Sequence, residues 1–111
     1  MKLILKLVAA GIFLFMLSVT VRASLAESLP AAWPAYTASP WAMATLWDAY
    51  SGFTIFWIWV AFRERSWPMR ILWLILIFAL GNIATAAYLF VAVSQLRDDQ
   101  PASAVLLPRH A

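Results

Sequence analysis

The chain of 111 residues is apolar and weakly basic: 65% of its residues are hydrophobic, 12% are charged, and the net charge is +3. That charged fraction is about half of what a soluble domain usually carries. A chain of this length has room for one domain and no separate catalytic module. Cysteine is absent, which excludes disulfides, thiolate metal sites and cysteine nucleophiles.

The first apolar segment covers residues 3–21 and is interrupted only by Lys6, whose side chain can reach back to the lipid headgroups. A cleavable signal peptide is the alternative, because a basic start, an apolar stretch over 7–21 and the sequence Ser24-Leu25-Ala26 follow one another. Arg22 in the cleavage region and the length of the apolar stretch favour a retained helix. If the segment were removed, a hairpin of two helices would remain.

Two further apolar segments cover residues 42–62, which include Asp48, and residues 71–93, which include no charged residue. Each is close to the ~20 residues that a membrane-spanning helix needs. No soluble core of so short a chain could surround the third segment on every side. The alternating ten-residue strands of a membrane barrel are not present. The sequence therefore predicts an all-α integral membrane protein with three transmembrane helices.

The connections differ in character. The first, residues 22–41, contains three prolines, and we expect an irregular or partly helical segment on the outer surface whose Trp33, Tyr36 and Trp41 offer a docking surface for a partner. The second, residues 63–70, is short and makes the second and third spans an antiparallel hairpin, with Ser66 placed to cap a helix and Pro68 in its first turn. The tail, residues 94–111, should be frayed unless something holds it.

Basic residues indicate the orientation. With three spans, the N-terminus and the second connection share one side and carry Lys2, Lys6, Arg63, Arg65 and Arg70. The other side carries Arg22, Arg97 and Arg109, offset by Glu27, Asp98 and Asp99. The positive-inside rule then places the N-terminus in the cytoplasm and the tail outside, and we expect a bacterial inner membrane.

The seven tryptophans fit a membrane. Trp33, Trp41 and Trp47 cluster near the proposed outer boundary, and Trp67 and Trp73 flank the cytoplasmic one. An indole ring has an apolar body and one polar N–H, so it prefers the headgroup level. Interfacial anchoring is therefore the simpler explanation than an aromatic ligand cage.

A polar stripe runs through the predicted bundle. Asp48 lies about six residues inside the second span, and Thr45, Ser51 and Gly52 share its helix face. The third span supplies Asn82, Thr85 and Tyr88, with Tyr88 at a depth close to that of Asp48. We predict an interhelical polar clamp made of Asp48, Ser51, Asn82, Thr85 and Tyr88, in which Tyr88 or Thr85 hydrogen-bonds the Asp48 carboxylate. Arg22 is the alternative partner for that carboxylate.

Two hypotheses explain an acid at this place. A polar clamp between helices is the structural one and is worth ~0.6–2 kcal/mol per contact. A protonatable site on a path for protons, ions or a ligand is the functional one. The clamp is favoured because Asp48 is the one acid inside a span and is shallow, whereas a proton-coupled carrier needs more than one buried ionisable group or an oligomer that repeats one.

Catalytic and cofactor motifs are missing from the sequence. The single histidine, His110, is the penultimate residue, so no span can ligate haem or chlorophyll through histidine. There is no cluster of metal ligands, no nucleophile with a neighbouring base and no glycine-rich phosphate loop. An enzyme is not expected, and neither is nucleic-acid binding. No intrinsic cofactor is expected, although lipid, quinone or carotenoid could contact the aromatic faces.

The second half of the chain resembles a known family. The residues that carry the likeness are Asp48-Ala49-Tyr50-Ser51-Gly52-Phe53, Phe56-Trp57, Arg63-Glu64-Arg65-Ser66 and Leu80-Gly81-Asn82. Together they resemble the small polytopic membrane proteins grouped as domain of unknown function 1475. The resemblance implies a membrane hairpin, implies no activity, and marks Asp48, Tyr50, Gly52, Arg63, Glu64, Gly81 and Asn82. Glu64, between two arginines, is expected to be a solvated loop charge.

These observations favour a non-catalytic accessory or assembly subunit of a larger membrane complex, whose partners are other membrane subunits and the lipid bilayer. The alternative is a small oligomeric carrier or channel that uses the polar stripe of Asp48 and Asn82.

Overall fold

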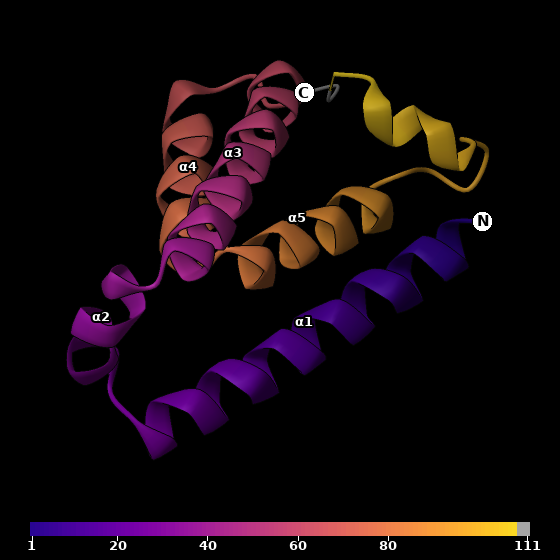
Figure 1. The fold of residues 1–111 in the computed structure, drawn as a ribbon. Coiled ribbons are helices and arrows are strands. Elements are labelled where there is room, and N and C mark those ends of the chain that lie inside the picture. The colour runs from indigo at the N-terminus through magenta and orange to yellow at the C-terminus, as the bar shows by residue number, and fades with distance from the viewer. Residues whose placement is uncertain (109–111) are drawn as a thin grey trace.

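The computed structural model describes residues 1–108, and all of their regular structure is helical. Its elements are α1 (Lys2–Ala26), α2 (Leu29–Ala38), α3 (Pro40–Arg63), α4 (Trp67–Leu80), α5 (Asn82–Ser94) and the short 3-10 helix η1 (Ala102–Leu106) (Figure 1). The predicted all-α class is confirmed. Arg109 and His110 of the predicted tail lie outside the described residues.

Three helices begin at the same serine–proline signature. The hydroxyls of Ser28, Ser39 and Ser66 each accept a hydrogen bond from the backbone N–H three residues on, at 3.3, 3.3 and 3.4 Å. Each helix also has proline in its first turn, where the missing N–H leaves no intrahelical bond unmade. The expected cap at Ser66 and Pro68 is therefore confirmed. Residues 22–41 are mostly helical, since they comprise the end of α1, the whole of α2 and the start of α3.

The predicted third span is not one helix. It is divided at Gly81, where α4 ends and α5 begins, with φ 62° and ψ −131°. Side chains with a Cβ rarely adopt this backbone conformation. A Cβ at Gly81 would also lie 3.1 Å from the Phe53 ring. Glycine therefore permits both the turn and the close approach of α3, and the uninterrupted helix predicted over 71–93 is wrong.

The turn at Gly81 determines how the helices are arranged (Figure 1). α4 returns beside α3, as the predicted hairpin requires, and α5 then swings away from α4 and lies along α1. The α1–α5 pair is antiparallel, since Lys2 at the start of α1 meets Arg97 just beyond the end of α5. The most extensive contact between helices is this α1–α5 pair.

The core is small and lies between α3, α4 and α5. Its buried members are Val60, Ile77, Ala84, Tyr88, Ala92, Val93 and Val105. Ala9 is the one buried residue of α1, so most of this apolar helix is exposed. The C-terminal half of α1 carries exposed Leu17, Val21 and Leu25. A large apolar surface is thus left uncovered by the chain itself.

Among the described residues, α1 is the helix that is both long enough and apolar enough to cross a membrane, with 25 residues and an 18-residue stretch whose mean hydropathy is 2.3. α4 and α5 are apolar but have 14 and 13 residues. The three predicted transmembrane helices are therefore not confirmed as such. Physically, the turn at Gly81 divides one predicted span into two short helices.

The two ends of the described chain meet. The Lys2 ammonium donates a hydrogen bond of 2.8 Å to the carbonyl of Arg97, and the Asp98 carbonyl lies 3.4 Å from the same nitrogen. The sequence-based prediction separated these segments by three spans, and the structure corrects it. Because α5 runs back from the turn at Gly81, the tail returns to the end of the molecule where α1 begins.

Candidate functional site

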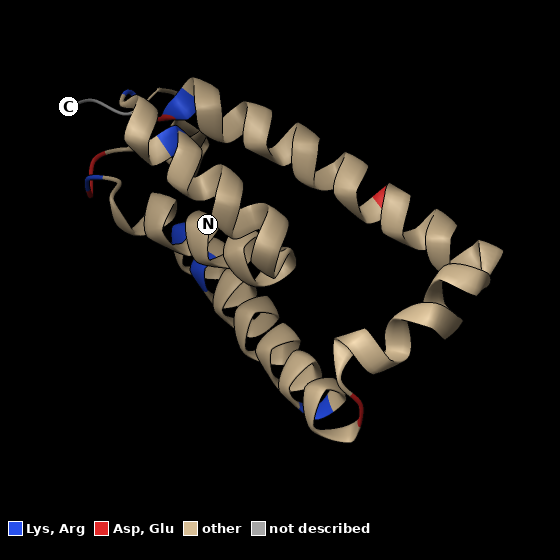
Figure 2. Ribbon diagram, turned by 90° about the vertical axis from the view of Figure 1, so that its left-hand side faces the viewer, with Lys and Arg blue, Asp and Glu red and all other residues tan. Residues whose placement is uncertain are grey.

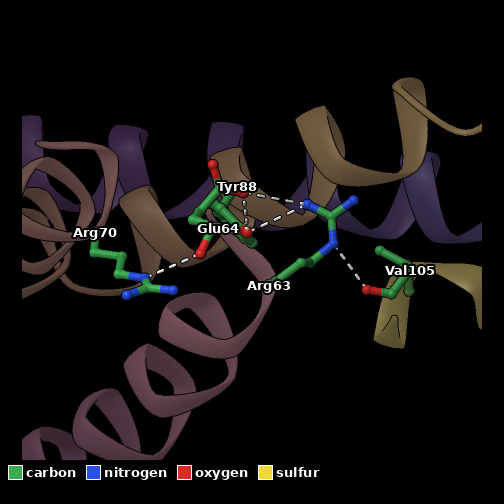
Figure 3. A network of polar contacts seen from close by, with 5 residues as sticks. All are labelled: Arg63, Glu64, Arg70, Tyr88 and Val105. Carbon is green, nitrogen blue, oxygen red and sulfur yellow. Dashed lines mark hydrogen bonds and ion pairs between the residues drawn. The ribbon is translucent and has the colours of Figure 1, made fainter. Parts of the chain in front are cut away.

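A buried polar network joins the end of α3 to the middle of α5 and to η1 (Figure 3). The Arg63 guanidinium donates from Nη1 to the Tyr88 hydroxyl at 3.2 Å and from Nε to the Val105 carbonyl at 2.9 Å. The Tyr88 hydroxyl in turn donates to Glu64 Oε2 at 2.8 Å. Arg63 Nη1 and Glu64 Oε2 are 3.6 Å apart, and both side chains are at most 4% exposed. Three segments of the chain are thereby held together.

Aromatic rings enclose the Tyr88 side chain. Trp73, Trp59 and Phe56 meet its ring edge to face, with centroids 4.9, 5.4 and 6.0 Å away. The Arg63 guanidinium lies over the same ring at 5.7 Å. Edge-to-face pairs and a cation over a ring are each favourable contacts. Because water is excluded here, the charged hydrogen bonds of the network are strong and costly to break.

This network corrects two predictions. Arg63 was expected to be a topology charge in a connection, and Glu64 a solvated loop charge, yet both are buried. The reason is that α5 and η1 fold back over the end of α3, which only a turn at Gly81 allows. Arg70 also contributes, since its Nε donates to the Glu64 carbonyl at 2.9 Å while its guanidinium lies 4.9 Å from the Trp67 ring.

The other described basic residues, except Arg22 near the end of α1, gather around the same end of the molecule. Figure 2 shows blue Lys and Arg positions at the start of α1, at the end of α3, at the start of α4 and beyond α5. Lys2 contacts the tail, Lys6 lies 5.5 Å from the Phe90 ring, and Arg65 is exposed in the connection after α3. Arg97 pairs with Asp99 at 3.5 Å on the surface. We call this region the basic end.

A second polar feature lies away from the basic end, beside the turn at Gly81. It is a groove of about 360 Å³ between α3 and the first turn of α5, lined by Asp48, Ala49, Gly52, Phe53, Phe56, Asn82 and Thr85. The structure thus brings together three of the five residues of the predicted clamp: Asp48, Asn82 and Thr85. Within residues 1–108 the Asp48 carboxylate has no hydrogen bond and no ion pair, so Arg22 is not its partner.

The other two clamp residues are elsewhere engaged. The predicted hydrogen bond from Tyr88 to Asp48 is wrong, because the Tyr88 hydroxyl is bound to Glu64 and Arg63. The Ser51 hydroxyl donates to the carbonyl of Trp47 in its own helix, at 2.8 Å. Thr85 donates to Asn82 Oδ1 at 3.2 Å rather than to Asp48. A tyrosine nearer the groove, Tyr50, donates to the Phe78 carbonyl at 2.9 Å and so ties α3 to the last turn of α4.

The predicted docking residues lie on α2 and at the start of α3. The Trp33 and Tyr36 rings stack with centroids 6.1 Å apart, and Trp41 is 84% exposed. Their role as a docking surface stays a prediction. A further depression of about 320 Å³ between α1 and α5 is wholly apolar and is lined by Ala10, Phe13, Leu14, Ala87, Phe90 and Val91. Lipid contact at such an apolar surface also stays a prediction.

Metal chemistry has no candidate in the described part of the chain, where no three side chains of the His, Cys, Asp and Glu types come together. Residues 1–108 instead offer a buried ion pair, a carboxylate in a groove and a large apolar exterior.

Comparison with known proteins identifies a family. The family described as protein of unknown function (DUF1475) matches residues 3–110. The chain belongs to this family. Neither a curated protein nor a solved structure matches it. The predicted resemblance is thereby confirmed, and it extends over nearly the whole chain rather than over its second half alone.

The seven positions that the family resemblance marked fall in two places in the fold. Arg63 and Glu64 form the buried network with Tyr88. The other five positions surround the groove and the turn beside it: Asp48, Tyr50, Gly52, Gly81 and Asn82. These two places are therefore the candidate functional sites of this DUF1475 protein.

Proposed function

We propose that this protein is an integral membrane protein in which α1 and α3 cross the bilayer and α4 with α5 forms a re-entrant hairpin. At about 1.5 Å per residue, the 24 residues of α3 are long enough to cross. Tryptophan scores as weakly polar on hydropathy scales, although its ring body suits the membrane interface. Phe53 contacts Gly81 and lies ten residues before Arg63, so the hairpin tip sits about 15 Å from the basic end, near mid-membrane.

Charge supports this arrangement over three crossing helices. With both ends of the described chain at the basic end, that side carries six described basic residues and the opposite side carries one, Arg22. The six are Lys2, Lys6, Arg63, Arg65, Arg70 and Arg97. The positive-inside rule then places the basic end, with the N-terminus and the tail, in the cytoplasm. The irregular backbone at Gly81 is packed against Phe53, as backbone at membrane depth must be. A bacterial inner membrane is the proposed location.

Within the membrane, we infer that the protein acts by contact, as a non-catalytic accessory or assembly subunit of a larger complex. The observation that carries this proposal is the unpacked apolar surface of α1 and α2, where Leu17, Val21, Leu25, Leu29 and Trp33 are all exposed. Lipid covers such a surface, and so do helices of other membrane subunits. The α2 segment lies at the side opposite the basic end, where it is accessible to a partner's extramembrane part.

Purification in a mild detergent, followed by mass analysis of the co-eluting chains, tests this proposal. Stable recovery with unlike subunits supports an accessory role. A variant with Leu17, Val21 and Leu25 all changed to alanine should lose those subunits, whereas the same change at Leu3, Leu7 and Val8 near the basic end is the control. Recovery of the wild-type chain without other subunits contradicts the proposal.

A small oligomeric carrier or channel is the second candidate, and the groove at Asp48 favours it. In membrane carriers, ligand sites lie where a helix is interrupted near mid-membrane. The turn at Gly81 is such an interruption, and Asp48 and Asn82 lie beside it. A pure homo-oligomer that moves a solute into liposomes would support this candidate.

A further inference from the structure

The groove at the hairpin tip combines one acid with two aromatic rings. Asp48 and Gly52 lie on α3 one turn apart, with Phe53 and Phe56 further along the same helix, and Asn82 and Thr85 face them from α5. Along α3, Asp48 is 15 residues from Arg63, which places it about 22 Å from the basic end. The acid is thus separated from the positive charges of the chain.

The Asp48 carboxylate lacks a counter-charge. No described residue pairs with it, and Arg22 and Glu27 are the remaining charges of the described chain outside the basic end and its loops. Asp48 is exposed on the surface of the chain, and under the membrane placement proposed above its surroundings have a low dielectric constant, which strengthens the attraction of its carboxylate for a cation. The Asp48 carboxylate in the groove is therefore expected to bind a cation that the chain itself does not supply.

The other lining residues indicate which kind of cation fits. One carboxylate without histidine or a second acid is a poor site for a divalent metal ion. Phenylalanine rings favour a cation above their faces and an apolar group beside them. Asn82 Oδ1 and the Thr85 hydroxyl are additional acceptors for N–H groups.

We propose that this groove binds a protonated amine that carries a small apolar group, with the ammonium on Asp48 and the apolar group against Phe53 and Phe56. The proposal rests on the membrane placement given above but not on the accessory role. Two sources supply this chemistry: a free amine, or the headgroup amine of a lipid.

Glycine at position 52 keeps the groove open. A Cβ placed there meets no atom within 4 Å, so a larger side chain can begin at this position and extend into the groove. Gly11 on α1 has the same open surroundings and lines none of the described grooves near α3. The pair therefore offers a blocking variant, Gly52→Leu, and a matched control, Gly11→Leu.

Isothermal titration of the full chain in phosphatidylcholine nanodiscs tests the site, with 2-phenylethylammonium as the probe and 2-phenylethanol as its uncharged counterpart. The wild type and Gly11→Leu should bind the ammonium probe saturably. Asp48→Asn should weaken binding at least tenfold, and Gly52→Leu should abolish it. Circular dichroism and gel filtration check that each variant is folded. Equal binding by wild type and Asp48→Asn, or equal binding of the alcohol and the ammonium, overturns the proposal.

Exchange of the nanodisc lipid distinguishes the two sources. If the lipid amine occupies the groove, phosphatidylethanolamine should weaken probe binding to the wild type and leave the residual binding of Asp48→Asn unchanged. A free amine as ligand predicts no effect of this lipid. Failure of the probe to bind while unlike subunits still co-purify would reject this site and leave the accessory role intact.

Discussion

Tyr88 is the residue on which the buried network depends. Its hydroxyl accepts from Arg63 and donates to Glu64, and its ring lies among Trp59, Trp73 and Phe56. Two buried charged groups share this single oxygen atom. A change at this position therefore separates the role of the hydroxyl from the role of the ring.

Tyr88→Phe removes the hydroxyl and keeps the ring. Because Arg63 and Glu64 then lose a buried partner, we expect the free energy of unfolding to fall by about 1–3 kcal/mol. Thermal unfolding in detergent, followed by circular dichroism, measures the loss. Tyr36→Phe is the control, since that ring stacks on Trp33 at the surface. Equal stability of the Tyr88→Phe variant and the wild type would reject the network.

Glu64→Gln keeps a hydrogen-bond acceptor but removes the negative charge beside buried Arg63. Breaking one side of a buried ion pair typically costs about 3–5 kcal/mol when the partner charge stays buried. We expect a smaller loss here, because the amide still accepts from Tyr88, but a clear drop in melting temperature. Asp99→Asn should change little, since the Arg97–Asp99 pair is more than 70% exposed on both sides. An equal drop in melting temperature for Glu64→Gln and Asp99→Asn would contradict a larger contribution of the buried ion pair to stability.

At the scale of the elements, the sequence predicted the helices that precede Gly81 but not the turn at Gly81 itself. The start of α4 was predicted from Ser66 and Pro68, and the apolar segments of α1 and α3 were predicted from composition. The division into α4 and α5 did not follow, because Gly81 without a nearby proline also fits a close helix contact. Only the positive φ and the Phe53 ring show why glycine is required.

The missed turn also explains the missed site. If residues 71–93 formed one continuous helix, it would run away from Arg63 and Glu64 and leave both as charges in an exposed loop. Once α5 runs back, Tyr88 reaches both residues, and no local pattern in the sequence indicates that contact. Asp48, Asn82 and Thr85 still line one groove, because Asn82 and Thr85 lie in the first turn of α5, directly after Gly81.

Gly81→Ala tests the turn. The backbone conformation at this position is strained for any residue with a Cβ, and the added methyl group meets the Phe53 ring at 3.1 Å. We expect a destabilisation of about 1–3 kcal/mol. Gly11→Ala, in an open position of α1, should be neutral or slightly stabilising, since alanine is the better helix former. A Gly81→Ala variant as stable as the wild type would indicate a continuous helix.

At the scale of the whole molecule, the central claim concerns the path of the chain. Three crossing helices place residues 22–41 and the tail on the same side of the membrane. The fold with a turn at Gly81 places α2 at one end and η1, tied to Arg63 through Val105, at the other. The positive charges at the basic end further favour a cytoplasmic tail.

The absence of native cysteine makes the decisive measurement direct. Single cysteines replace Ala35 on α2 and Ser103 in η1, both exposed positions, and intact cells are treated with a membrane-impermeant maleimide. The re-entrant fold predicts labelling of Ala35→Cys from outside and of Ser103→Cys only after the membrane is opened. Labelling of both variants in intact cells would contradict it and restore three crossing helices.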